Sequence, residues 1–398
     1  MQSVGRIVVY AALVCFAGLA LAGPVAAQEV VEFSAHTADY RFAERLDFAA
    51  EFSSTAVILD GYVFYQVGES ERIWVYEGDI SRGRLDVSVP LDQNNQPQAF
   101  TTIRYWFRIA SDHGEFFESP HYTFYYEDNR FNWQQAELAS FTLYWHAGGA
   151  DFAARVLAAA AESVARVQTL LPLSAPRPVT LRVYAEQTDL ERVVELAGYP
   201  WAAGHMQPGA GVLLFALEPG AQAAGLRIVP HEVAHLTLYD GLGADGYANL
   251  PAWLNEGIAT LAEGEPDPQQ LALLQAAARA GALPPLYSLC ANFPQDAGLA
   301  QLASIQSASL VRYLVERFNQ TGFTILVEAY ARSGDCINAS QAAFGVDLLQ
   351  LELDWRRDTF EQPNPLAEVP WGAIVSAAGV ATLLWLLSRL AARSGRQA

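Results

Sequence analysis

The sequence contains no lysine, so all 24 of its basic residues are arginine. A chain without lysine cannot form a lysine Schiff base and cannot supply the lysine of a phosphate-binding P-loop. The basic residues are also few against 43 acidic ones, which gives a formal net charge of −19. Because such an acidic surface repels the phosphates of nucleic acids, we expect no nucleic-acid partner.

Long apolar runs are confined to the two ends of the chain. Near the N-terminus, Arg6 precedes an apolar run over residues 7–21, and a small-residue site ends at Ala27. This order is typical of a secretory signal peptide, which we predict at residues 1–27. A membrane anchor is the alternative, but the run is short for a bilayer core of about 30 Å. We therefore expect the protein to be exported.

Residues 371–387 carry no charge and are followed by Arg389, Arg393 and Arg396. With its neighbours this stretch approaches the roughly 20 residues of a spanning helix, and arginines beyond it favour the cytoplasmic side. The sequence predicts a transmembrane helix at 370–390 and a basic cytoplasmic tail at 391–398; a buried or amphipathic terminal helix is the alternative. The result would be a single-pass cell-membrane protein whose main part, with 43 acidic and 20 basic residues, is extracytoplasmic.

Cysteine is scarce. Cys15 lies in the predicted signal peptide, which leaves Cys290 and Cys336 in the exported part. An even pair of cysteines in an oxidising compartment favours a disulfide between them. Two separate buried thiols are the alternative, because neither cysteine lies near a second Cys or His at metal-ligand spacing.

Residues 28–131 contain short segments rich in aromatic and β-branched residues, with turn-forming residues between them. Such segments stand at 62–67, 72–76, 102–109 and 122–126. Their spacing predicts an all-β, immunoglobulin-like sandwich. This domain is either a spacer and folding partner or a binding module for substrate or cell surface, since a fold alone specifies no activity.

From residue 132 the pattern mixes helix and strand. Residues 151–171 place apolar side chains at helical spacing, residues 179–184 resemble a strand, and helical patterns dominate from 268 to 358. The sequence therefore predicts a multidomain chain: the sandwich at 28–131 is followed by an α+β domain with a helical C-terminal lobe at 132–360. A linker at 361–369 then leads to the transmembrane helix.

His231 and His235 enclose Glu232 in the order His-Glu-Val-Ala-His. Residues four apart lie on one face of a helix, so both imidazoles can reach one metal ion while Glu232 reaches a water beside it. A catalytic zinc usually has three protein ligands and one open position, and Glu256 follows at a workable distance. We predict one Zn2+ per chain, bound by His231, His235 and Glu256. The alternative is an amphipathic helix whose histidines merely pack against a core.

Residues 228–263, above all the run Trp-Leu-Asn-Glu-Gly-Ile-Ala at 253–259, resemble the gluzincin metallopeptidases, which include thermolysin and the zinc aminopeptidases. Within that group the run is similar to peptidase MA-like domains, and a weaker likeness covers residues 303–318. The resemblance implies a gluzincin-type domain in which the strand at 211–217 lies at the edge of the cleft; an ordinary buried strand is the alternative. The Gly-x-Met-x-Asn signature of the aminopeptidases is absent, which argues against that exopeptidase activity.

The sequence departs from the family pattern at two positions. Pro230 stands directly before the first histidine, so it must occupy the first helical turn or kink the helix, and we expect the helix to begin later than in relatives. Thr260 stands where thermolysin-like enzymes have an aspartate that supports a ligand histidine. Glu263, one turn further, is a substitute for that aspartate.

The resemblance also implies a Tyr or His that stabilises the oxyanion from the helical lobe. Tyr313, Tyr287 and Tyr330 are the candidates by position, although helical tyrosines usually pack with the hydroxyl at an edge. His205 either lines the substrate cleft or is a loop histidine bonded to backbone, and the second role is favoured.

Together these observations predict a membrane-anchored zinc metallopeptidase that hydrolyses peptide or protein substrates with a zinc-bound water and Glu232 as general base. One alternative is a non-hydrolytic, zinc-stabilised binding or adhesion protein of the cell surface. Another is a membrane-tethered structural protein without metal. The presence of Glu232 favours the peptidase, because a protein that only binds zinc would need the three ligands but not this glutamate.

Overall fold

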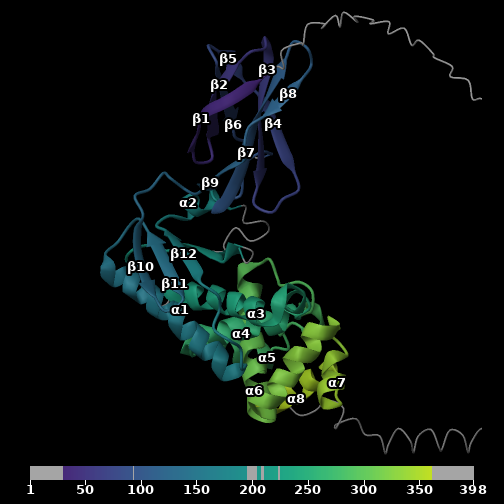
Figure 1. The fold of residues 1–398 in the computed structure, drawn as a ribbon. Helices are drawn as coiled ribbons and strands as arrows, with labels where there is room; N and C mark the ends of the chain where they lie inside the picture. Colours follow the sequence, from purple (N-terminus) through teal and green to yellow (C-terminus); the bar gives the residue numbers. More distant parts are fainter. Residues whose placement is uncertain (1–29, 93, 195–203, 208–209, 223–224, 361–398) are drawn as a thin grey trace, which may run out of the picture. The chain divides into compact units, whose positions relative to one another are not determined.

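The computed structural model describes residues 30–360, apart from residues 93, 195–203, 208–209 and 223–224 (Figure 1). Contacts divide the chain into two compact units. Within the described residues, the first unit contains 30–40, 44–91 and 103–124, and the second contains 41–43, 92–102 and 125–360. No helix in the described part of the chain is long and apolar enough to cross a membrane. The predicted signal peptide and transmembrane helix lie outside the described residues.

The first unit is a sandwich of two sheets. One sheet has the strand order β1-β2-β6-β5, and the other has the order β4-β3-β7-β8, with β9 also paired to β7. Phe48 of the first sheet contacts Tyr65 and Tyr105 of the second, with ring centroids 6.0 and 5.2 Å apart. The structure confirms the predicted sandwich, and its immunoglobulin-like topology stays a prediction. The strands are β1 Val31–Arg41, β2 Arg45–Ser54, β3 Ile58–Val67, β4 Ile73–Glu77, β5 Asp79–Ser81, β6 Arg84–Pro90, β7 Thr101–Ser111, β8 Phe116–Glu118 and β9 Tyr122–Tyr126.

The second unit begins with a mixed sheet in the order β10-β11-β12-β14-β13. Its central strands β11, β12 and β14 are parallel, and the two edge strands are antiparallel to their neighbours. Helix α1 (Ala150–Leu170) connects β11 to β12, close to the helix and strand that the sequence predicts there. The strands are β10 Gln134–Leu138, β11 Phe141–Trp145, β12 Val179–Tyr184, β13 Gly204–Gln207 and β14 Val212–Ala216.

The strand predicted at 211–217 does not lie at the edge of this sheet. It corresponds to β14, which is paired on one side with β12 and on the other with β13. Val212, Leu213, Leu214 and Phe215 are all buried, as expected for a strand covered on both faces. The expectation that 211–217 is an edge strand is therefore wrong, the alternative of an ordinary buried strand is confirmed, and the short strand β13 lies at the edge of the sheet.

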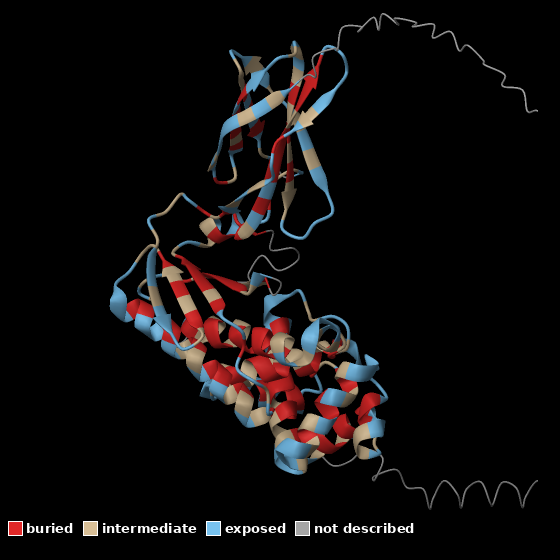
Figure 2. Ribbon diagram, viewed as in Figure 1, coloured by how far each residue is buried: buried red, intermediate tan, exposed pale blue. Residues whose placement is uncertain are grey.

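Helices form the rest of the second unit. Helix α3 lies between two hydrophobic cores: Val229, Val233 and Leu236 pack with the sheet and α1, whereas Ala234 and Leu238 pack with the other helices. Figure 2 shows buried residues concentrated along α3 and α4. Burial on both sides fixes α3 in position. The helices are α2 Gln187–Glu191, α3 Ile228–Ala248, α4 Ala252–Ala262, α5 Pro268–Arg279, α6 Ala297–Ser333, α7 Ala339–Phe344 and α8 Leu348–Phe360.

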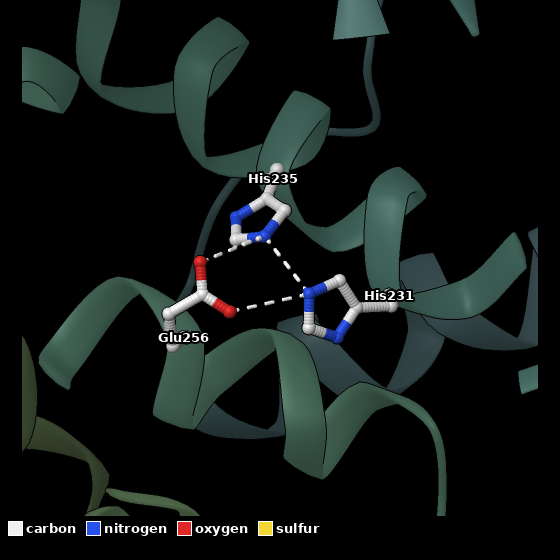
Figure 3. Close-up of side chains that lie close together, drawn as sticks. All are labelled: His231, His235 and Glu256. Atoms are coloured by element: carbon white, nitrogen blue, oxygen red, sulfur yellow. Dashed lines mark hydrogen bonds and ion pairs between the residues drawn. The ribbon is translucent and has the colours of Figure 1, made fainter. Parts of the chain in front are cut away.

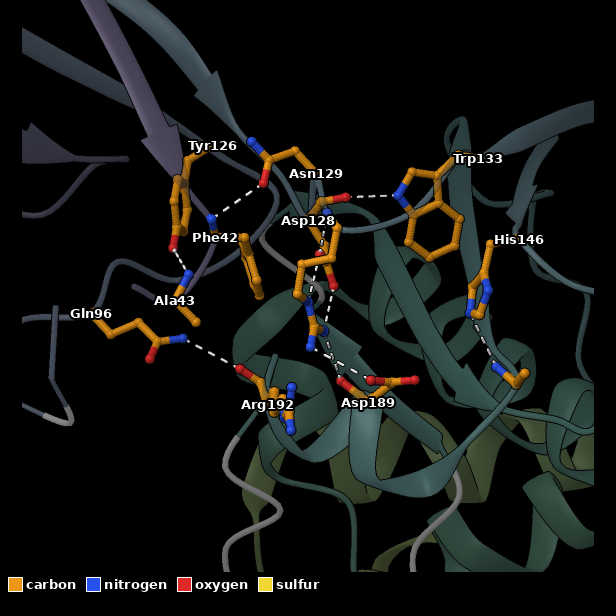
Figure 4. A network of polar contacts seen from close by, with 12 residues as sticks. Phe42, Ala43, Gln96, Tyr126, Asp128, Asn129, Trp133, His146, Asp189 and Arg192 are labelled. Carbon is orange, nitrogen blue, oxygen red and sulfur yellow. Dashed lines mark hydrogen bonds and ion pairs between the residues drawn. The ribbon is translucent and has the colours of Figure 1, made fainter. Parts of the chain in front are cut away.

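A polar network within the second unit holds residues from its early segments against residues further along the chain (Figure 4). The Asp128 carboxylate is fully buried and accepts two hydrogen bonds from Arg130, at 2.9 and 2.7 Å. The Trp133 indole donates to the Asp128 carbonyl at 2.7 Å, and the Phe42 amide donates to the Asn129 side chain at 3.2 Å. The second unit thus includes residues ahead of residue 132. The domain boundary at 131/132 stays a prediction.

A disulfide joins Cys290 to Cys336. The Cys290 carbonyl also accepts a hydrogen bond from the Ala252 amide at 2.9 Å, at the first residue of α4. Because the bridge closes a loop between residues 46 apart, replacing both cysteines by alanine should lower the free energy of unfolding by about 4 kcal/mol. Denaturant unfolding of the oxidised protein and the double variant measures this difference, and coincident unfolding curves would contradict it.

Candidate metal centre

His231 and His235 lie one turn apart on α3. The helix begins at Ile228, so Pro230 is its third residue and occupies the first turn, where no backbone N–H is needed for the helix. The Ser163 hydroxyl of α1 donates a hydrogen bond of 2.6 Å to the Pro230 carbonyl. Pro230 therefore leaves the two histidines on an unbroken helical turn.

Glu256 of α4 faces both histidines (Figure 3). The Nε2 atoms of His231 and His235 are 3.1 Å apart. One Glu256 carboxylate oxygen lies 3.3 Å from Nε2 of His231, and the other lies 3.6 Å from Nε2 of His235. Ligand bonds of about 2.0–2.1 Å in a tetrahedral zinc site place the ligand atoms roughly 3.3 Å apart. The three predicted ligands could therefore hold one metal ion between them.

The other ring nitrogen of each histidine is held by a hydrogen-bond partner. Nδ1 of His231 lies 2.9 Å from a Glu263 carboxylate oxygen, and Nδ1 of His235 lies 3.0 Å from the side-chain oxygen of Asn255. With a proton on Nδ1, each ring presents the lone pair of Nε2 to a metal. The structure thus places Glu263 in the supporting role that the sequence suggests for it.

A second layer of contacts fixes these partners. The Asn255 amide donates to the Tyr247 hydroxyl at 3.0 Å, which leaves its oxygen to face His235. Tyr247 reaches this position because α3 is interrupted at Gly243, whose φ of 75° favours glycine. On the other side, the Arg227 Nε atom lies 3.6 Å from Glu263.

The pKa values keep Glu256 negatively charged, which favours cation binding, and keep the Tyr247 hydroxyl protonated. Burial alone would raise the pKa of Glu256, but the neighbouring His235 and His231 outweigh this effect and lower the pKa to about 2. Burial lowers the pKa of His231, whereas the Glu256 and Glu263 carboxylates raise it well above 6.5. Burial raises the pKa of Tyr247 to about 12, so its hydroxyl stays protonated at neutral pH. A metal ion would therefore displace a proton from His231 on binding.

Glu232 is the residue after His231 and lies against the edge strand β13. A methyl group built on Gly204 would approach its Cγ to 2.7 Å. His205 follows on the same strand, and its pKa is lowered by burial and raised in part by Glu232. His205 is thus on a strand beside Glu232, which differs from the loop position favoured by the sequence.

Two of the three tyrosines proposed for oxyanion stabilisation have other contacts. Tyr330 is fully buried against Trp253 in the helical core, and Tyr313 donates its hydroxyl to Asp358 at 2.8 Å. Tyr287 is 65% exposed. Tyr247, which the sequence did not single out, reaches the metal centre through Asn255.

Sequence patterns could have found only some of the supporting residues. Asn255 directly precedes Glu256, so its amide was available as a partner for one histidine. Tyr247 depends on the turn at Gly243, and Arg227 lies in a short 3-10 helix at Gly225–Arg227 ahead of α3. Neither of these positions follows from helical spacing alone.

Removing the Glu263 carboxylate should weaken metal binding. In Glu263→Gln the partner of His231 loses its charge, and loss of such a supporting contact typically lowers metal affinity about 10- to 100-fold. Competition with a chelator measures the dissociation constant of zinc. Glu328→Gln, which removes an exposed carboxylate paired with Arg332, is the control and should bind zinc as the wild type does. Equal affinities of the two variants would contradict the assigned role.

Two solved structures that resemble the chain are an M1 zinc metallopeptidase mutant from Deinococcus radiodurans bound to a Tyr-Ser-Ala substrate and an aminopeptidase N family protein from Idiomarina loihiensis. The first is 12% identical with a TM-score of 0.36, covering 81% of this chain and 92% of its own. The second is 8% identical with a TM-score of 0.34, covering 82% of this chain and 73% of its own.

No curated protein matches the chain. The family model of the Peptidase MA superfamily matches residues 159–360, which include His231, His235, Glu256 and both supporting residues. The chain belongs to the Peptidase MA superfamily.

Proposed function

We propose that the protein is a zinc-dependent peptidase with one Zn2+ per chain, held by His231, His235 and Glu256. The observation that supports this most strongly is the spacing of 3.1–3.6 Å between the two Nε2 atoms and from each of them to an oxygen of the Glu256 carboxylate, together with hydrogen-bond partners on both outer ring nitrogens. A merely packed pair of histidines would not need a carboxylate opposed to both Nε2 atoms.

We assign Glu232 the role of general base, because it follows the first ligand histidine and is not itself among the three candidate ligands. When bound, zinc would polarise the scissile carbonyl and make water acidic enough to attack near neutral pH. Glu232 would accept the proton of the attacking water and pass it to the departing amine. The protonated Tyr247 hydroxyl, which accepts from Asn255 and lies within electrostatic range of Glu232 and Glu256, would donate to the developing oxyanion.

The edge strand β13 is suited to hold an extended peptide. It pairs with β14 on one side, and its Gly204 backbone lies against Glu232. A peptide that added itself to the outer side of β13 would place its backbone beside the proposed base, with main-chain hydrogen bonds giving affinity. We therefore assign peptides or unfolded protein segments as substrates.

Substitution of Gly204 should reduce turnover without removing the metal. In Gly204→Ala the added Cβ would lie 2.7 Å from Cγ of Glu232 and 3.0 Å from the Ile228 side chain, so Glu232 must move. Because displacing a catalytic group by about 1 Å can cost about 100-fold, we expect kcat to fall by that order while zinc content is unchanged. Gly220→Ala, where the added methyl meets nothing within 4 Å, is the matched control. An unimpaired Gly204→Ala protein would contradict this placement of Glu232.

The proposed location is the cell membrane, with the catalytic part extracytoplasmic and the C-terminus inside. The support is the uncharged segment 371–387 followed by arginines, and the apolar run before Ala27. Digestion of a peptide library by the purified protein, analysed by mass spectrometry, tests the enzymatic proposal. Cleavage that disappears with a chelator and returns with zinc supports it, and a zinc-loaded protein that cleaves no peptide favours the binding or adhesion alternative.

A further inference from the structure

A cavity of about 100 Å³ lies next to the supporting residues of the metal centre. It is bordered by the end of α4, by α5 and by α6, and none of His231, Glu232, His235 and Glu256 lines it. Its apolar wall consists of Leu261, Leu271, Leu274, Ile305 and Ala308. An apolar space of this size is comparable with cavities that bind small hydrocarbons.

The charged residues that line the cavity are all basic. Arg227 and Arg312 both line it, and no acidic residue does. Thr260 also lines it, and the Thr260 hydroxyl is buried without a hydrogen-bond partner among the described residues. The cavity therefore combines an apolar wall with two arginines and no carboxylate, which matches a ligand with an apolar body and one carboxylate.

The two arginines differ in how firmly they are held. Arg227 donates to the Gln270 side chain at 3.3 Å and to the Glu265 carbonyl at 2.6 Å, and it faces Glu263. Arg312 forms an ion pair with the Glu265 carboxylate at 3.0 Å. Both side chains of that pair are exposed, at 40% and 84%, so the pair contributes little and can be exchanged for another carboxylate.

We propose that this cavity binds a short aliphatic carboxylate of about six carbons, with its chain against the leucines and its carboxylate on Arg312. Glu265 occupies the same guanidinium in the absence of this ligand and competes with it. The site is separate from the proposed zinc centre, although Arg227 links its wall to Glu263 and hence to His231. It would make the peptidase a receptor for small acids of this class.

Binding of hexanoate to the full-length, zinc-loaded protein tests the proposal by titration calorimetry. Hexan-1-ol, which has the same chain without the charge, should bind at least about tenfold more weakly. Arg312→Gln should weaken hexanoate binding by about tenfold, whereas Glu265→Gln should strengthen it by a few-fold because the competing carboxylate is gone. These measurements involve no peptide cleavage, so they are independent of the proposed enzymatic function.

Two further variants separate the cavity from other sources of binding. Arg332→Gln removes an exposed arginine of the same helix that is also paired with a glutamate, and it should leave hexanoate binding unchanged. Ala308→Met fills the cavity with a flexible side chain and should abolish binding. Binding that survives both Arg312→Gln and Ala308→Met, as a carboxylate bound directly to zinc would, overturns the proposal. Absence of hexanoate binding to the wild type overturns it as well.

Discussion

Replacing Glu232 by glutamine is expected to lower the rate of peptide cleavage by about 10²- to 10⁴-fold while zinc remains bound, because general-base catalysis typically contributes that factor. Glutamine has nearly the shape of glutamate but cannot accept the proton of the attacking water. Glu232 projects toward Gly204 of β13 and is not among the three groups that could hold a metal ion, so its loss should leave the ligands in place.

The measurement combines kcat on a peptide substrate with zinc content for the wild type and Glu232→Gln. Glu328→Gln, with its carboxylate on the exposed surface of α6, serves as the matched control and should retain full activity. If Glu232→Gln cleaves as fast as the wild type, the assigned general base is wrong. If Glu232→Gln loses its zinc, Glu232 also contributes to metal binding, and its assignment as a base alone is wrong.

Replacing Asp128 by alanine should lower the free energy of unfolding by about 3–5 kcal/mol, because it leaves a partly buried guanidinium without its main partner. The Asp128 side chain has no exposed surface, and Arg130, at 21% exposure, donates to both of its oxygens. Arg130 keeps a weaker contact with Asp189 at 3.5 Å. Arg130 in the variant would therefore lose its main carboxylate partner but keep the weaker one.

Asp86→Ala is the matched control, because Asp86 forms an ion pair with Arg84 in which both side chains are about half exposed. We expect that substitution to change stability by less than about 1 kcal/mol. Equal effects of the two substitutions on denaturant unfolding would show that the network in Figure 4 does not stabilise the second unit. A large effect for Asp128 alone would show that residues before 132 are needed by the metal-binding unit.

Helical spacing explains why the candidate metal ligands could be brought together from the sequence. His231 and His235 must share a face of any helix, and Glu263 lies two turns after Glu256 on α4, so their common direction follows from the helical period. Helix α1 and strand β12 were also predictable, because each has a strong pattern of apolar residues.

Features that depend on pairing between distant segments could not be predicted. The pattern of β14 is a run of buried apolar residues, but whether such a strand is central or at an edge depends on β13, a strand of four residues with little strand character. Likewise, the inclusion of residues 41–43 and 92–102 in the second unit rests on tertiary contacts that leave no periodic signal.

Anomalous X-ray diffraction from crystals of the zinc-loaded protein, recorded on both sides of the zinc absorption edge, tests the central claim most directly. We predict one anomalous peak per chain, about 2.0–2.2 Å from Nε2 of His231, Nε2 of His235 and a carboxylate oxygen of Glu256. A peak at other residues, or zinc bound to the histidines with Glu256 turned away, would contradict the account.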